Sequence, residues 1–220
     1  MNATVKDVMT TQVVAVRSGA TFKEMAAALR QYRVSAFPVI DEQEKVLGVV
    51  SEADLLAKEA LTDPGVLAGA LHHEDVSKAG GLTAGDLMTP RAVTVRPEDS
   101  VEHAAQLMYF LLVKRMPVVD ADGGLVGLVS RADVLAVYDR PDDDIREEIT
   151  GNVIVRGFGE DPCQFAVTVQ AGVVTVQGSP ETAALGHDIV RKIRHVPGVV
   201  VVHDQLSYPE AYPIVAGPVF

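Results

Sequence analysis

Two serine–aspartate pairs have the residue types and the spacing to hold a ligand. Ser51 is followed three positions later by Asp54, and Ser130 is followed in the same way by Asp133. Each serine stands where a helix is expected to begin, and a helix N-terminus that carries a hydroxyl is a prepared site for an anion. An aspartate one turn further on can accept two hydroxyl hydrogens. The plainer alternative is that each serine is only a helix N-cap and each aspartate only a first-turn charge.

The two pairs belong to an internal repeat. Residues 5–57 align with residues 84–136 at a constant offset of 79 without a gap, and 18 of the 53 aligned positions are identical. One unit of about 50 residues buries too little surface to be stable by itself. We therefore expect the two units to pack by their sheets into one core.

Each copy predicts the same elements around its serine. Thr21 and Glu24 form a capping box at the start of a helix, and Ser100 and His103 take these positions in the second copy. Apolar residues at helical spacing then predict one buried face in each helix: Phe22, Met25, Ala26 and Leu29 in the first copy, and Val101, Ala104, Ala105 and Met108 in the second. Two strands joined by a polar turn follow (38–40 and 46–50, then 117–119 and 125–129), and a second helix begins at the serine.

Three segments of each copy resemble a known family. They are the openings D-V-M-T and D-L-M-T, the segments F-P-V-I-D and M-P-V-V-D, and the segments G-V-V-S-E-A-D-L-L and G-L-V-S-R-A-D-V-L. On these motifs, residues 1–138 resemble the cystathionine-β-synthase (CBS) domain pair. The resemblance implies an α/β (α+β) fold in which two tandem units, 1–60 and 83–138, are joined by a linker over 61–82 and pack as one module. It also implies clefts that bind AMP, ADP, ATP or related adenosine ligands, and frequent dimerisation.

The resemblance also implies roles for the serine–aspartate pairs. In the family motif the hydroxyl reaches a phosphate and the acid binds the ribose hydroxyls, and these positions are Ser51 and Asp54, then Ser130 and Asp133. In the adenylate-sensing subunit of AMP-activated kinase, which the pair resembles, basic residues just before the proline contact phosphates.

The two copies differ in charge at those positions. The second copy has Lys114, Arg115 and Arg131, and the first copy has Ser35, Ala36 and Glu52 in their place. Phosphate binds to cations and is repelled by a carboxylate. We therefore expect a nucleotide to bind mainly through five residues of the second copy: Lys114, Arg115, Ser130, Arg131 and Asp133. The alternative is that the cations are solvated surface charges.

The C-terminal third has a different pattern. An acidic hinge is expected over 139–144, although its acids can also start a helix. Residues 145–208 predict the order helix, strand, strand, helix, strand, with the first helix ending near Gly151. With V-V-T-V-Q-G-S and the segment around V-P-G-V, this part resembles the BON domain, a small non-enzymatic αββαβ module that would act as an interaction surface. Residues 209–220 are expected to be a tail.

Many relatives with this second module are linked to membranes. Arg191, Lys192 and Arg194 form a compact basic cluster that could contact an anionic head group. Cations at a helix C-terminus also interact favourably with the helix dipole, and we favour this second interpretation.

The bulk composition limits the function further. The net charge of −11 argues against nucleic acid as a partner. One cysteine, Cys163, and no signal-peptide pattern favour a cytoplasmic protein.

We see no catalytic motif and no metal-ligand spacing, so we expect a regulatory protein that needs no obligatory cofactor and is not an enzyme. The alternative is a dimeric adaptor with empty clefts. Apolar residues on every side of segment 107–113 favour a homodimer contact there.

Overall fold

The computed structural model describes residues 3–60 and 81–208, and the chain divides into two compact units. One unit comprises Thr4–Val134, and the other begins at Leu135. Most of the linker expected over 61–82, and the whole tail over 209–220, lie outside the described residues. The units are considered one at a time below.

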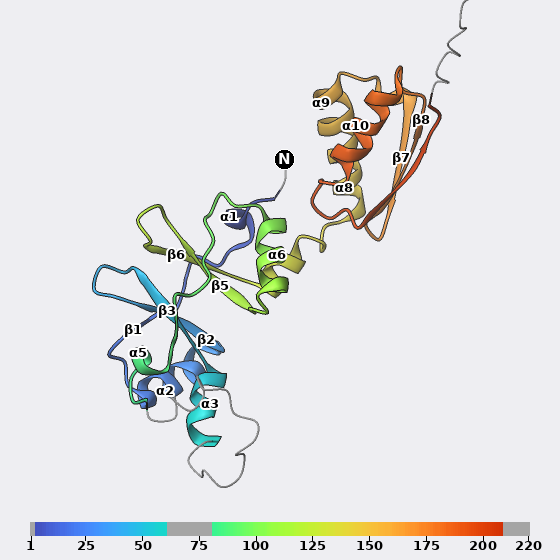
Figure 1. Ribbon diagram of the computed structural model, residues 1–220. Helices are drawn as coiled ribbons and strands as arrows, with labels where there is room; N and C mark the ends of the chain where they lie inside the picture. The colour runs from blue at the N-terminus through green and yellow to red at the C-terminus, as the bar shows by residue number, and fades with distance from the viewer. Residues whose placement is uncertain (1–2, 61–80, 209–220) are drawn as a thin grey trace, which may run out of the picture. The chain divides into compact units, whose positions relative to one another are not determined.

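The two repeats form the first unit, and their elements follow the expected order (Figure 1). The first copy contains α1 (Val5–Val8), β1 (Val16–Arg17), α2 (Phe22–Tyr32), β2 (Ala36–Ile40), β3 (Val46–Ser51) and α3 (Glu52–Ala60). The second contains α5 (Ala84–Leu87), β4 (Thr89–Pro90), α6 (Val101–Phe110), β5 (Arg115–Val119), β6 (Leu125–Ser130) and α7 (Arg131–Ala136). Each copy is thus a hairpin with a helix on either side of it in the sequence.

The predicted helix starts are confirmed. Thr21 and Glu24 form a complete capping box at α2, and the Ser100 side chain accepts a hydrogen bond from the His103 amide at α6. Hydrogen bonds from the Thr21 amide and hydroxyl lower the pKa of the Glu24 carboxyl. Because the folded pKa is lowered, this capping contribution is present near neutral pH and is lost as the pH falls through the lowered pKa.

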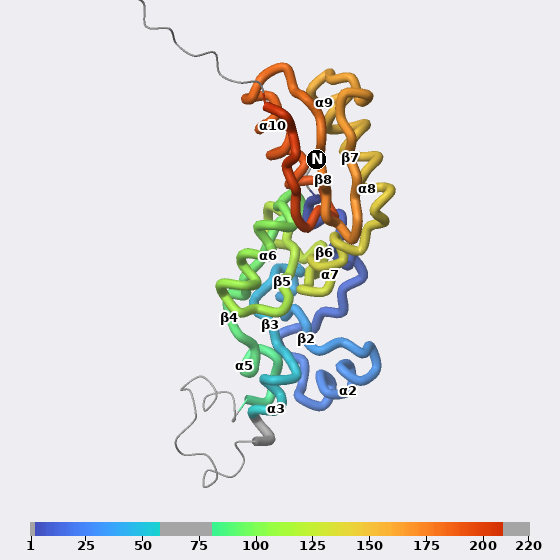
Figure 2. Tube along the Cα trace, turned by 90° about the vertical axis from the view of Figure 1, so that its right-hand side faces the viewer, coloured from blue at the N-terminus to red at the C-terminus, as the bar shows by residue number. Residues whose placement is uncertain are grey.

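The opening segments of the two copies are exchanged. Strand β4, which follows α5 at the start of the second copy, pairs antiparallel with β3 of the first copy (Figure 2). Thr10, at the start of the first copy, forms a two-way backbone bridge with Leu128 on β6 of the second copy. The expectation was that the copies pack by their sheets, and it did not include this exchange, in which each copy adds backbone to the hairpin of the other.

Two glycines permit this exchange. A Cβ atom added at Gly48 would lie 2.5 Å from the Thr89 carbonyl oxygen and 2.8 Å from the Met88 sulfur. A Cβ atom at Gly127 would lie 2.7 Å from the Met9 sulfur. At these two positions the incoming segment approaches the strand so closely that no side chain can be accommodated without a shift.

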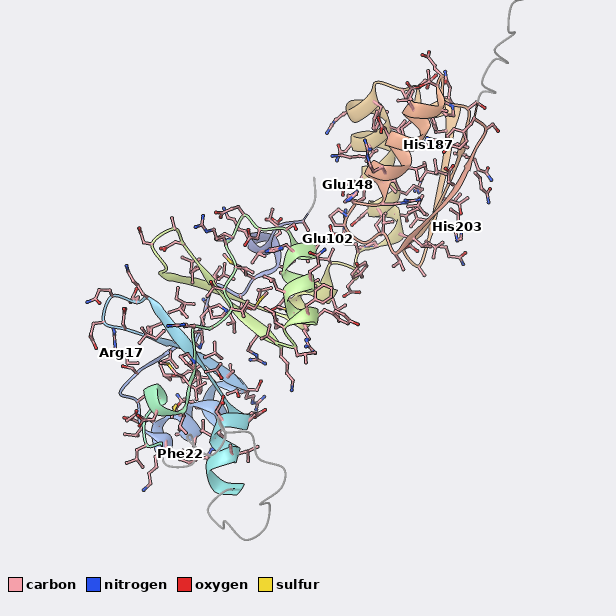
Figure 3. The ribbon with its side chains drawn as sticks, viewed as in Figure 1. Arg17, Phe22, Glu102, Glu148, His187 and His203 are labelled. Carbon is pink, nitrogen blue, oxygen red and sulfur yellow. The ribbon has the colours of Figure 1, made fainter. Side chains whose placement is uncertain are left out.

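The polar turns of the two copies also meet. The Val46 amide donates to the Gly123 carbonyl at 3.2 Å, and the Leu125 amide donates to the Glu44 carbonyl at 3.1 Å. Near the first turn, Arg17 donates to the Asp41 carbonyl at 2.6 Å (Figure 3). The two backbone hydrogen bonds, from Val46 and from Leu125, join the hairpins of the two copies at their turn ends.

The C-terminal unit places its helices on one face of a three-stranded sheet (Figure 1). Helix α8 (Asp142–Glu148) continues through a π-helical stretch, η1 (Ile149–Val155), into α9 (Arg156–Phe158). After a short 3-10 turn, η2 (Pro162–Gln164), the chain forms β7 (Phe165–Gln170), β8 (Val173–Gly178), α10 (Ala183–Ile193) and β9 (Val201–Leu206). Strands β7 and β8 are antiparallel, and β8 and β9 are parallel. The expected order of elements is confirmed, but the first helix does not end near Gly151, because buried Val153 and Ile154 extend its apolar face into the core.

The region expected to be an acidic hinge is largely structured. Asp142–Asp144 form the first turn of α8, and the Asp142 carboxylate accepts hydrogen bonds from the Ala171 and Gly172 amides at 2.7 and 2.9 Å. Arg140 donates to the Pro197 carbonyl at 2.9 Å and forms an ion pair with Glu148 at 2.8 Å (Figure 3). Polar contacts thus hold residues 140–144 within the C-terminal unit.

We predict that Gly48→Ala and Gly127→Ala each lower the free energy of unfolding of the first unit by about 1–3 kcal/mol, the usual cost of overpacking. Gly48→Ala should lower the free energy of unfolding more than Gly127→Ala does. The atom nearest to the added Cβ at Gly48 is a backbone oxygen, whereas at Gly127 it belongs to a flexible side chain. Gly19→Ala is the control, since nothing lies within 4 Å of its added Cβ atom. Urea denaturation measures all three, and equal stability of the three variants would contradict the close-approach argument.

We predict that Asp142→Ala lowers the stability of the C-terminal unit by about 1–3 kcal/mol, because two turn amides lose a charged acceptor. Asp143→Ala is the matched control. Asp143 makes a solvent-exposed ion pair with Arg146, and such pairs contribute at most about 1 kcal/mol. Limited proteolysis followed over a urea series should show earlier cleavage for Asp142→Ala only, whereas a flexible acidic hinge would leave the two variants alike.

Candidate functional site

A cleft of about 370 Å³ lies in the first unit and is lined by both copies. The first copy contributes the ends of its hairpin and the start of α3: Ser35, Ala36, Val49, Ser51, Glu52, Ala53 and Asp54. The second copy contributes its exchanged opening and the connection between α6 and β5: Thr89, Arg91, Ala92, Val93, Leu112, Val113, Lys114 and Arg115. The exchange of opening segments is what brings residues 89–93 to this cleft.

The structure groups the predicted site residues differently from what the sequence led us to expect. Lys114 and Arg115 lie in the same cleft as Ser51 and Asp54 of the first copy. Ser130, Arg131 and Asp133, which were expected to act with Lys114 and Arg115, do not line this cleft. The expectation paired residues within one copy, whereas the fold places the cations of the second copy next to the serine–aspartate pair of the first.

Both serine–aspartate pairs have helix-capping geometry. The Ser51 amide and hydroxyl donate to Asp54 Oδ2 at 2.8 and 2.7 Å, and the Ser130 amide and hydroxyl donate to Asp133 Oδ2 at 2.7 Å each. The capping alternative is therefore realised in both copies. Of the two pairs, only Ser51 and Asp54 also line this cleft.

The Arg131 side chain donates to two backbone carbonyls of its own copy. Its Nε donates to the Val113 carbonyl at 3.0 Å, and its Nη2 donates to the Met108 carbonyl at 3.2 Å. These carbonyls lie at the end of α6 and in the connection that follows it. Arg131 thus holds the backbone of a segment that lines the cleft, although its own side chain is outside the lining.

Arg91 was not identified from the sequence. Its amide donates to the Leu47 carbonyl at 3.0 Å beside the pairing of β4 with β3, and its backbone is left-handed with φ of 52°. The corresponding residue of the first copy is Gln12. An arginine after the motif M-T-P was the available signal, but nothing local shows that this segment crosses to the other copy.

The cleft combines apolar walls with a local excess of positive charge. Val49, Val93 and Val113 are among the apolar residues that line it. Three cations (Arg91, Lys114 and Arg115) and two acids (Glu52 and Asp54) give a local formal charge of +1, in a chain of net charge −11. Such a cleft suits a ligand with one flat apolar part and one anionic part.

A second hollow of about 330 Å³ lies in the C-terminal unit, beside the end of α10. It is lined by Phe158, Asp188, Arg191, Lys192 and His195. Arg191 donates to Asp188 at 2.6 Å, so one cation is already paired with an acid. Arg194, the third residue of the predicted basic cluster, does not line the hollow.

Within the described parts of the chain, no helix is long and apolar enough to cross a bilayer, and no cluster of at least three His, Cys, Asp or Glu residues could hold a metal ion.

We predict that Arg131→Ala lowers the free energy of unfolding by about 1 kcal/mol, because the two carbonyls lose their charged donor at a largely exposed position. Arg131→Lys should recover only part of the loss, since an ammonium group cannot reproduce the fork geometry of a guanidinium. Thermal denaturation compares the two variants. Equal stability of wild type and Arg131→Ala would show that these hydrogen bonds do not hold the α6–β5 connection.

The CBS domain model matches residues 5–60 and 84–140. The CBS domain-containing protein CBSX1 of Arabidopsis thaliana, a chloroplastic protein, is 35% identical over an alignment of 133 residues, which covers 54% of this chain and 56% of that protein. The CBS domain-containing protein YhcV of Bacillus subtilis is 32% identical over 132 residues, which are 60% of this chain and 83% of the relative. This chain therefore spans about half the length of the plant relative and most of the bacterial one.

Solved structures agree with the fold of the first unit. The crystal structure of CBSX2 in complex with AMP has a TM-score of 0.53 at 34% identity and covers 60% of this chain and 94% of that one. The CBS domain pair of protein MJ0100, solved with 5′-methylthioadenosine and S-adenosyl-L-methionine, has a TM-score of 0.53 at 22% identity, covers 63% of this chain and 98% of that one, and supports the fold alone. The C-terminal unit beyond residue 140 lies outside the residues that match the domain model.

Proposed function

Since the chain belongs to the CBS domain family, we propose that it is a regulatory protein that binds an adenosine-containing nucleotide, AMP, ADP or ATP, in the cleft between its two copies. The observation that carries the proposal is the lining of the cleft, which joins a hydroxyl–carboxylate pair, apolar walls and three cations. The AMP complex of the similar protein CBSX2 supports the choice of ligand.

Each group of lining residues has a proposed role. Lys114, Arg115 and Arg91 bind the phosphate, because guanidinium and ammonium groups make charge-assisted hydrogen bonds to its oxygens. The Asp54 carboxylate accepts the ribose hydroxyl hydrogens. The Ser51 hydroxyl, which donates to Asp54 in the free protein, turns to donate to phosphate at the start of α3. The valine side chains face the adenine ring. Ser130 and Asp133 repeat the capping geometry and are proposed as the corresponding contacts of a second position in the other copy.

The family relationship and the cleft favour binding rather than chemistry. A nucleotide that binds the native state raises its stability by mass action, so binding can be measured as a shift in unfolding. We propose a non-catalytic role in the cytoplasm, with no obligatory cofactor.

The C-terminal unit is proposed to be a BON-type interaction module, because its αββαβ order and its V-P-G-V turn follow that pattern. Contact of Arg191, Lys192 and Arg194 with an anionic membrane remains the less favoured proposal, since Arg191 is paired with Asp188. Vesicles that contain phosphatidylserine, tested by co-sedimentation, distinguish the two.

Homodimerisation is proposed through α6. Tyr109 and Phe110 are each 75% exposed, and Leu112, just after the helix, is 81% exposed. Burial of such side chains against a second copy would release about 25 cal/mol for each Å² of apolar surface. The same face favours the alternative function, a dimeric adaptor whose cleft stays empty.

We predict that Asp54→Asn weakens AMP binding by about 1.5–3 kcal/mol, the range for a hydrogen bond to a charged group. Asp7→Asn is the matched control, because Asp7 accepts the same pair of hydrogen bonds, from the Thr4 amide and hydroxyl, outside the cleft. Isothermal titration calorimetry of the full chain measures both. If neither AMP, ADP nor ATP binds the wild type, the adaptor function is favoured instead.

We predict that the wild type is a dimer at micromolar concentration and that Phe110→Glu converts it to a monomer, because a buried unpaired carboxylate at the contact is costly. Gln31→Glu, at the corresponding position of the first copy, should leave the dimer intact. Light scattering coupled to size-exclusion chromatography measures the mass. A wild-type monomer would remove the proposed role of this face.

A further inference from the structure

Two methionines, Met9 and Met88, close the contacts between the copies. Each is the C-cap of the short helix in its opening segment, and its sulfur lies against a glycine of the other copy. A Cβ atom added at Gly127 would lie 2.7 Å from Met9 Sδ, and one added at Gly48 would lie 2.8 Å from Met88 Sδ. Each thioether therefore packs directly on bare backbone.

These two methionines differ in exposure from the methionines of the core. Met9 and Met88 are half-buried, whereas Met25, Met108 and Met116 are at most 2% exposed. Oxidation of a thioether requires that an oxidant in solution reaches its sulfur. We therefore expect peroxide to attack the two contact methionines before the three core methionines.

Hydrogen peroxide converts a methionine side chain to the sulfoxide. The sulfur–oxygen bond forms as the O–O bond of the peroxide breaks, and the proton of the transferred oxygen passes to the departing hydroxide, which becomes water. The sulfur is oxidised by two electrons and the peroxide is reduced by two. The product is polar and carries one more heavy atom. Since even a Cβ atom at Gly48 is too close to Met88 Sδ, the sulfoxide oxygen has no space on the glycine side, and the side chain has to move away from the strand.

The position of Met88 connects this movement to the cleft. Met88 directly precedes β4, whose two residues pair with β3, and the next amide, that of Arg91, donates to the Leu47 carbonyl at 3.0 Å. Residues 91–93 then line the cleft. A shift of Met88 away from Gly48 therefore separates β4 from β3 and withdraws Arg91 from the cleft.

Met9 occupies the corresponding position in the first copy. The residue after it, Thr10, bridges to Leu128 on β6, and none of these three residues lines the cleft. Met9 is thus a matched internal control, which has the same chemistry and the same kind of contact in the other opening segment.

We propose that Met88 is a reversible oxidation site, at which peroxide releases β4 and lowers the affinity of the cleft for its ligand. Oxidation of Met9 loosens the other hairpin contact and leaves this cleft intact. The release of β4 follows from the contact geometry alone, whereas its effect on ligand affinity rests on the proposed function.

The first test identifies the oxidised residues. Cys163 is an exposed free thiol that peroxide would also attack, so Cys163→Ser serves as the parent of every variant. The full chain is treated with hydrogen peroxide and digested with trypsin, which cleaves after Lys and Arg and places each methionine in a separate peptide. Mass spectrometry should find one added oxygen on Met9 and on Met88 before any on the three core methionines. Oxidation of the core methionines at the same rate would overturn the proposal.

The second test follows β4 and the ligand. Hydrogen exchange of the Arg91 amide, measured by NMR, should become faster when the parent or Met9→Leu is oxidised, but not when Met88→Leu is oxidised. Leucine has a similar volume and no sulfur, so each variant keeps the packing. Calorimetry with AMP should show that oxidation weakens binding by about 5- to 150-fold in the parent and in Met9→Leu, the factor that corresponds to the usual cost of a steric clash, and by less than about twofold in Met88→Leu. Methionine sulfoxide reductases A and B together should restore the parent.

The outcomes of the second test separate this proposal from the nucleotide function. If Met88→Leu loses AMP affinity on oxidation as the parent does, or if oxidised Met88 leaves Arg91 exchange and AMP affinity unchanged, the proposal is overturned while the nucleotide function stands. If the unoxidised parent does not bind AMP, the nucleotide function fails, and the exchange of the Arg91 amide still decides whether oxidation releases β4.

Discussion

The close approach of each copy's opening segment to the other copy's hairpin is the constraint on which the first unit depends. Gly48 and Gly127 leave room for Met88 and Met9, whose sulfur atoms occupy the space that a Cβ atom would need. The two repeated motifs are therefore complementary parts of one contact: the methionine of the opening fits against the glycine before the serine. Because the contact always joins different copies, neither copy can complete its own sheet.

The composition of the cleft follows from this exchange. Strand β4 pairs with β3 and so brings the residues that follow it, Arg91 to Val93, to the cleft beside the start of α3. Ser51 and Asp54 lie at that helix start. Lys114 and Arg115, at the start of β5, line the same cleft. Arg131 donates a hydrogen bond to the carbonyl of Val113, the residue just before them. The site is thus shared by both copies. It is asymmetric because Lys114, Arg115 and Glu52 have no residue of the same charge at the corresponding positions of the other copy.

The C-terminal unit depends on a different kind of contact. Its apolar core joins both helical segments to the sheet, but polar groups fix its first residues in place. Asp142 binds the amides of the β7–β8 turn, and Arg140 binds the carbonyl of Pro197 before β9. A run of acids that is typical of a solvated hinge therefore includes one carboxylate that closes a turn 29 residues further along the chain.

The sequence by itself determined what depends on neighbours in the chain. The repeat, the capping residues Thr21 and Ser100, the hairpins and the order of the C-terminal elements were all predicted, because caps, turns and amphipathic faces arise from contacts within a few residues. Only the tertiary structure decided which copy each cation serves, that Arg131 binds backbone carbonyls, that Arg91 reaches the cleft and that the first C-terminal helix continues past Gly151. These features depend on contacts between distant segments, and a repeat makes them harder to predict, because each residue has two nearly equivalent partners and only three-dimensional packing selects between them.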